Sequence, residues 1–81
     1  MYTFYILYSV VRDRYYIGHT GDQMAERLRR HQSDHKGFTG GAGDWEVVYT
    51  AYFETKELAY AREREVKSWK SRKRIELLVK A

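Results

Sequence analysis

The sequence predicts an α+β domain in which a small three-stranded sheet carries helices, in the order β-β-α-β-α-α. Two observations support the sheet: two aromatic and β-branched runs stand close together near the N-terminus, and a third follows a glycine-rich stretch. A third observation supports the helices, because apolar residues recur every three or four positions in the remaining segments. A chain of 81 residues has room for one domain, residues 1–81, with a small core.

The first two strands are expected to form a β-hairpin over residues 3–19. The run TFYILYSVV at residues 3–11 is apolar at both alternating sets of positions, which is typical of a central strand covered on both faces. The residues Arg-Asp-Arg at 12–14 provide the turn, and Tyr-Tyr-Ile-Gly-His at 15–19 returns as the second strand.

A helix is expected next, over about residues 23–35, with Asp22 at its N-cap. Positions three and four apart share one face of a helix, so this one presents a partly polar stripe. The stripe consists of Met24, Leu28, His31 and His35, with Arg27 at its margin. Four glycines among residues 37–43 then indicate a loop.

The second half of the chain predicts one strand and two helices. Residues 45–53 alternate in polarity as a third strand, and Thr55 is the expected N-cap of a helix over about residues 56–69. The inner stripe of that helix is expected to consist of Leu58, Ala59, Val66 and Trp69. A short amphipathic helix with Ile75, Leu78 and Val79 ends the chain.

The charge of the chain favours a polyanionic partner. Fifteen Lys and Arg residues stand against eleven Asp and Glu residues, and seven of the thirteen residues at positions 62–74 are basic. Such a cluster favours nucleic acid, although a solvated helix face is the alternative. The chain contains no cysteine, no long apolar run and no basic leader before its aromatic start. We therefore expect a soluble protein of the reducing cytoplasm, outside any membrane.

Four short motifs connect the chain to a known family. They are FYILYS at residues 4–9, YYIGHT at 15–20, ERLRRH at 26–31, and the glutamate of AREREVKSW at 61–69. With these motifs the chain resembles the GIY-YIG nuclease family, and more closely its small stand-alone bacterial members. The resemblance covers nearly the whole chain and implies a three-stranded antiparallel sheet flanked by helices.

The resemblance also implies which residues act. The implied catalytic residues are Tyr5, Tyr16, Arg27, His31 and Glu63. Tyr5 stands in the first triplet, Thr3-Phe4-Tyr5, which lacks the family's glycine, whereas Tyr16-Ile17-Gly18 matches the second triplet fully. The chain has no asparagine, so one phosphate or metal contact of the family is unassigned.

Phosphodiester hydrolysis explains why these residue types would be needed. Glu63 would hold one Mg²⁺ or Mn²⁺ ion, because one carboxylate with water and substrate oxygens suits a small hard cation. Arg27 would provide a permanently charged fork for phosphate oxygens. A tyrosine hydroxyl, of Tyr5 or Tyr16, would order or deprotonate the attacking water if Arg27 and His31 stabilise its phenolate. Glu65 lies two positions from Glu63 on another side of the helix, which disfavours a two-metal site.

The shared site sets a condition on the hairpin. Because successive side chains of a strand point to opposite faces, Tyr5 and Tyr16 share a face only if the paired residue numbers have an odd sum.

Further basic residues are candidates for phosphate contacts. They are Arg30, Lys36, Lys67, Lys70, Arg72, Lys73 and Arg74. DNA, duplex or branched, is the expected partner; RNA and the oligomeric state are left open, and a partner protein is one source of specificity.

Structural alternatives exist for several candidates. Glu63 could simply pair with Lys67 four residues later, and Arg27 with Glu26 or Glu63. His31 could be a hydrogen-bonded core residue, or half of a zinc site with His35.

The expected function is a metal-dependent DNA endonuclease in repair or recombination, with selectivity for DNA structure left open. The alternatives are a non-catalytic nucleic-acid-binding module with the same fold and a protein-binding adaptor.

Overall fold

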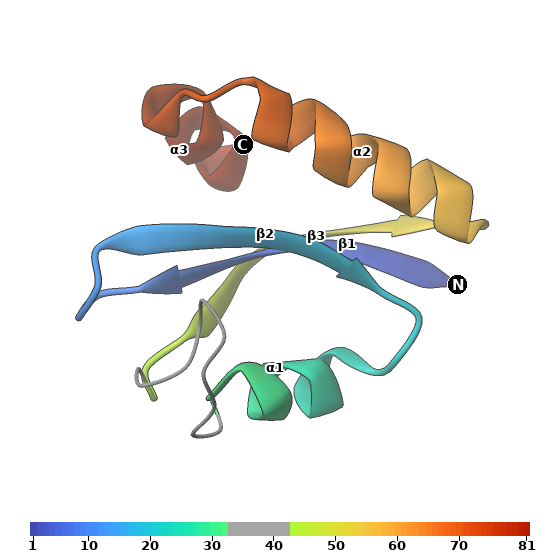
Figure 1. Ribbon diagram of the computed structural model, residues 1–81, viewed down its shortest axis with the longest axis horizontal. Coiled ribbons are helices and arrows are strands. Elements are labelled where there is room, and N and C mark those ends of the chain that lie inside the picture. The colour runs from blue at the N-terminus through green and yellow to red at the C-terminus, as the bar shows by residue number, and fades with distance from the viewer. Residues whose placement is uncertain (33–42) are drawn as a thin grey trace.

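The three aromatic and β-branched segments pair into one antiparallel sheet with the strand order β2-β1-β3. The computed structural model describes residues 1–32 and 43–81. Along the chain the elements are β1 (Tyr2–Ser9), β2 (Arg14–Thr20), α1 (Met24–Gln32), β3 (Glu46–Phe53), α2 (Lys56–Ser68) and α3 (Arg72–Lys80). Helix α1 covers one face of the sheet, and α2 and α3 cover the other (Figure 1). The predicted fold class and element order are confirmed.

Strand β1 is central and buried on both faces, as its continuous apolar sequence predicts. On one face Phe4 and Ile6 pack with Ile17 of β2 and Val66 of α2. On the other face, the α1 side, the buried side chains are Tyr5, Leu7 and Trp45, with Tyr16, Met24 and Leu28 packed against them. Each large apolar side chain buried in this way contributes about 1.5–3 kcal/mol to stability.

The hairpin register meets the condition for a shared face. Tyr5 lies opposite Gly18, and Leu7 lies opposite Tyr16, so every pair of residue numbers has an odd sum. Because Leu7 is two residues from Tyr5, Tyr16 is on the same face as Tyr5.

The N-cap prediction is confirmed for α2 and wrong for α1. The Thr55 hydroxyl accepts a hydrogen bond from the Leu58 amide at 3.2 Å. Helix α1 begins later than expected, because Gln23 supplies the carbonyl for its first bond, from the Arg27 amide. Asp22 belongs to the preceding turn, where its amide donates to Thr20 Oγ1 at 3.0 Å. The expected end of this helix at residue 35, including His35, lies outside the described residues.

The predicted inner stripe of α2 needs one correction. Ala59 and Val66 are buried and Trp69 packs against the core, but the Leu58 side chain is 54% exposed. Leu58 precedes Ala59 by one residue, which rotates it by roughly 100° around the helix and away from the sheet.

Candidate active site

The Tyr5 hydroxyl is the centre of a hydrogen-bonded cluster under α1. Tyr5 is fully buried, and its oxygen lies 2.8 Å from His31 Nε2. Arg27 Nε donates to the same oxygen at 3.3 Å. Arg27 donates and the phenol oxygen accepts, so the Tyr5 hydroxyl binds two side chains of α1 at once. Arg27 and His31 reach one oxygen because they are four residues apart on one helix face.

Tyr16 completes the cluster from the edge strand. Its ring lies 4.5 Å from the His31 ring and 6.3 Å from the Tyr5 ring, the latter nearly parallel at 27°. Tyr5 and His31 are buried, whereas Tyr16 and Arg27 are partly exposed. A bound substrate would therefore meet Tyr16 and Arg27 first, with Tyr5 and His31 behind them.

Gly18 creates the space that the Tyr5 side chain occupies. A Cβ atom at position 18 would lie 2.8 Å from the Tyr5 hydroxyl oxygen, 2.9 Å from Tyr5 Cζ and 3.1 Å from Tyr16 Cε1. The two separations from Tyr5 are below 3.0 Å, which real Cβ atoms essentially never show, and the separation from Tyr16 is tighter than nine in ten real Cβ contacts. Gly18, the glycine of the second triplet, is thus required because the Tyr5 ring packs against β2 at this position.

The positive charge near Tyr5 does not outweigh the effect of burial on the pKa of its phenol. Burial raises the pKa of the Tyr5 phenol above its usual value of 10.0, and this effect outweighs the lowering by the Arg27 hydrogen bond and charge. A partly exposed guanidinium stabilises the phenolate less than the buried surroundings destabilise it. As a neutral phenol, Tyr5 is suited to hold Arg27 and His31 in place.

Glu63 approaches the same region from the opposite layer. It projects from α2, its side chain is 12% exposed, and its two oxygens bind different elements. Oε1 accepts from His19 Nδ1 at 2.6 Å, and Oε2 accepts from Lys67 Nζ at 2.7 Å. The Glu63 charge also contributes to the raised pKa of Tyr5. The Lys67 pairing that we considered as an alternative is therefore present, yet Glu63 also reaches β2.

His19 is the residue that sequence reasoning missed. It follows Gly18 directly, and it binds a carboxylate 44 residues away in the chain. The available signal was its position beside the second triplet, on the same strand face as the buried Ile17, which packs with Val66 of α2. His19 connects the edge strand to α2 at the point where the two layers of the site meet.

A family model for the GIY-YIG catalytic domain matches residues 1–76 of the 81-residue chain. The chain belongs to the GIY-YIG family. Domains of this family are generally nucleases and typically use divalent metal ions. Searches of curated proteins and of solved structures give no significant match to this GIY-YIG domain. Within residues 1–32 and 43–81, helices long and apolar enough to cross a membrane are absent.

The possible metal ligands of this GIY-YIG domain suit one hydrated ion better than a site in which several protein side chains surround the metal. Among the described residues there is no group of three or more His, Cys, Asp or Glu side chains that could hold a metal. Glu63 offers one carboxylate, which suits Mg²⁺ or Mn²⁺ when water and a substrate phosphate provide the other oxygens. For Glu63 to bind the ion, one of its oxygens would have to lose its hydrogen bond to Lys67 or His19. Glu65 pairs instead with Arg62, at 2.8 Å.

The predicted phosphate-binding residues fall into two groups. Arg30 of α1 is exposed and lies 3.7 Å from Glu26, and Lys36 lies outside the described residues. The other group lies in the last turn of α2 and in the chain after it: Lys67, Lys70, Arg72, Lys73 and Arg74, all exposed. Within it Lys67 binds Glu63, and the Arg74 guanidinium lies 4.4 Å from the centre of the Trp69 ring.

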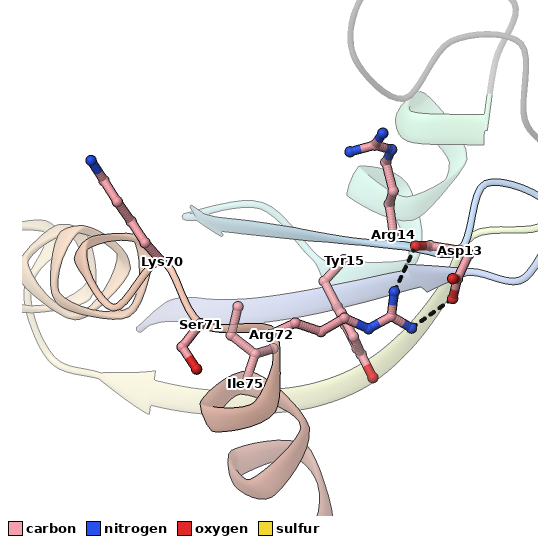
Figure 2. Close-up of a pocket in the computed structure, with 7 residues that line it drawn as sticks. All are labelled: Asp13, Arg14, Tyr15, Lys70, Ser71, Arg72 and Ile75. Carbon is pink, nitrogen blue, oxygen red and sulfur yellow. Dashed lines mark hydrogen bonds and ion pairs between the residues drawn. The ribbon is translucent and has the colours of Figure 1, made fainter.

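Arg72 connects α3 to the turn between β1 and β2. Its two terminal nitrogens donate to Asp13, to the carboxylate at 2.6 Å and to the main-chain carbonyl at 3.0 Å (Figure 2). The guanidinium also lies over the Tyr15 ring, and Nε donates to Glu76 at 3.1 Å. Hydrogen bonds from Arg72 and Tyr8 lower the pKa of Asp13 from 3.8 to about 2. Arg72 thus has a structural role in the fold, and any phosphate contact would compete with these bonds.

Proposed function

We propose that this GIY-YIG domain is a metal-dependent endonuclease that hydrolyses phosphodiester bonds in DNA. The observation that carries the proposal is the cluster of Tyr5, Tyr16, Arg27 and His31, with Glu63 reaching β2 beside it. The cluster combines a buried hydrogen-bond network with partly exposed groups of the kind that phosphoryl transfer requires.

Arg27 is proposed to bind the scissile phosphate. Its Nε–H is used by Tyr5, which fixes the plane of the guanidinium, and its terminal N–H groups can form a two-pronged contact with phosphate oxygens. A fixed guanidinium loses little freedom on binding, so the contact favours the charge that develops in the transition state.

Tyr16 is proposed to orient the attacking water, with Tyr5 and His31 as positioning residues. Tyr16 is the partly exposed tyrosine of the cluster, and the buried His31 ring packs against it at 4.5 Å. The neutral Tyr5 phenol holds Arg27 and His31 from behind.

Glu63 is proposed to hold one Mg²⁺ or Mn²⁺ ion. When bound, such an ion stabilises negative charge on phosphate oxygens as a Lewis acid. Lys67 pairs with the same carboxylate. When the ion replaces Lys67 at Glu63, the freed lysine is proposed to contact the DNA backbone. A role in repair or recombination, a cytoplasmic location and a partner protein that adds specificity belong to the same proposal.

A cleavage assay tests the proposal directly. Purified protein is incubated with duplex, nicked, flap and branched DNA in Mg²⁺ or Mn²⁺, beside Glu63→Gln and the control Glu65→Gln. We expect cleavage by the wild type and the control, and a loss of at least about 100-fold for Glu63→Gln, the usual scale for a group that stabilises transition-state charge.

The alternative is a non-catalytic nucleic-acid-binding module, and one observation favours it. Both Glu63 oxygens already have protein partners, His19 and Lys67. If the wild type binds these DNAs and cuts none of them in either metal, this alternative replaces the endonuclease.

A further inference from the structure

A groove of about 510 Å³ lies where the first turn of α2 faces the end of β2. Its walls are His19, Lys56, Glu57 and Tyr60. This volume is within the range of roughly 300–1,000 Å³ that is usual for small-molecule sites. The groove is therefore large enough for a nucleotide-sized group.

Two aromatic rings form the inner part of the groove. The Tyr60 side chain is 47% exposed although it is large and apolar, and its ring lies 5.4 Å from the His19 ring. The two ring planes meet at 52°. A planar base can stack on the exposed part of the Tyr60 ring, which is how proteins commonly bind unpaired bases.

The charged walls match the remaining parts of a nucleotide. Lys56 can pair with a backbone phosphate, and the Glu57 carboxylate can accept a hydrogen bond from the exocyclic amino group of a base. The Arg64 guanidinium lies 5.7 Å from the centre of the Tyr60 ring and adds positive charge nearby. Together the walls present a stacking surface, a cation and an acceptor.

The groove adjoins the proposed catalytic carboxylate. His19 forms its wall and also binds Glu63 at 2.6 Å through Nδ1. A base held in the groove would thus belong to a nucleotide near the metal ion that Glu63 is proposed to hold.

We propose that this groove holds an unpaired base of the cut DNA strand, so that flap and branched DNA are preferred over fully paired duplex. In a duplex both faces of a base are covered by its neighbours, and the base must be unstacked before it can enter. The inference rests on the proposed endonuclease function for the identity of the strand, but base binding is measurable without metal or cleavage.

The test compares binding of three DNAs in EDTA by fluorescence anisotropy. They are a flap whose junction carries one unpaired base, the same flap with an abasic nucleotide at that position, and the fully paired duplex. We expect wild-type protein to bind the first DNA about five- to a hundredfold more tightly than the second, the usual effect of one stacked base.

Matched variants assign the effect to Tyr60. Tyr60→Ala should abolish the difference between the base-containing and abasic flaps, whereas Tyr60→Phe should retain it. The control Tyr52→Ala removes a tyrosine of β3 that is also exposed, at 64%, but does not line the groove, and it should retain the difference too.

The outcomes separate the two proposals. Equal affinity of the wild type for the base-containing and abasic flaps overturns the groove, whatever the variants do. Discrimination between these DNAs without cleavage in Mg²⁺ or Mn²⁺ supports the groove and refutes the endonuclease. Cleavage without discrimination refutes the groove alone, and absence of DNA binding refutes both.

Discussion

The substitution Gly18→Ala gives a direct test of the close contact between β2 and the Tyr5 ring. The new Cβ atom would lie 2.9 Å from Tyr5 Cζ, whereas ordinary contacts begin at 3.4 Å, so the ring must move by about 0.5 Å. Tyr5 is fully buried, and the Arg27 bond to its oxygen is already 3.3 Å long. The ring therefore cannot move without disturbing the core and this bond.

We expect Gly18→Ala to lower the free energy of unfolding by about 1–3 kcal/mol, the usual cost of overpacking a core. For a domain of this size that corresponds to a fall in Tm of roughly 4–20 °C. Urea unfolding measures the effect, with Gly43→Ala as the control because a Cβ atom there meets nothing within 4 Å. In a Tyr5→Leu background the cost of Gly18→Ala should shrink, since the opposing ring is gone. Equal stability of Gly18→Ala and Gly43→Ala would refute the reasoning.

Two further predictions concern pH. The pKa of Asp13 is lowered to about 2, so its pair with Arg72 stabilises the fold above pH 3.8 and this contribution is lost as the pH falls through about 2. Arg72→Ala should therefore lower the Tm near neutral pH, and its Tm should fall less than that of the wild type between about pH 4 and pH 2. Parallel curves of Tm against pH for the two proteins would contradict the role of the pair. Burial raises the pKa of the Tyr5 phenol above 10.0, so its contribution is present below pH 10 and lost as the pH rises through the folded-state pKa. Above pH 10, the free energy of unfolding of Tyr5→Phe should thus depend less on pH than that of the wild type. Urea unfolding at a series of pH values measures this, and an identical pH dependence of the two proteins would refute the prediction.

The sheet was predictable because its signals are local. The apolar run from residue 3 predicted a central strand followed by a hairpin turn, and both are present. The predicted strand end at Val11 is wrong: β1 ends at Ser9, and Val10 and Val11 are exposed in the turn that Asp13 closes with a bond to the Val10 carbonyl. Placing Tyr5 and Tyr16 in one site required that the numbers of paired residues have an odd sum. The pair of Tyr5 and Gly18 meets this condition.

The contacts between layers were not predictable to the same degree. The bond between His19 and Glu63 joins residues 44 positions apart, and nothing in either segment specifies how α2 is rotated over the sheet. The same rotation exposes Leu58. The role of Arg72 depends on Asp13, whose backbone takes a positive φ of 52° in the hairpin turn, and neither composition nor spacing encodes that conformation.

The raised pKa of Tyr5 was missed for a related reason. The sequence shows Arg27 and His31 near a tyrosine, but it does not show that the ring is fully buried. Desolvation depends on the packing of α1 against the sheet, and it decides the direction of the shift.

The placement of the site in two layers has a consequence for synthesis on the ribosome. Once β1, β2 and α1 have emerged, every member of the tyrosine cluster has been made, but the carboxylate and its lysine are still to come. That part of the chain also lacks β3, so β1 has a strand partner along one edge only. A nascent or truncated chain that ends before α2 therefore lacks Glu63, so the proposed cutting activity would be withheld until α2 has been translated.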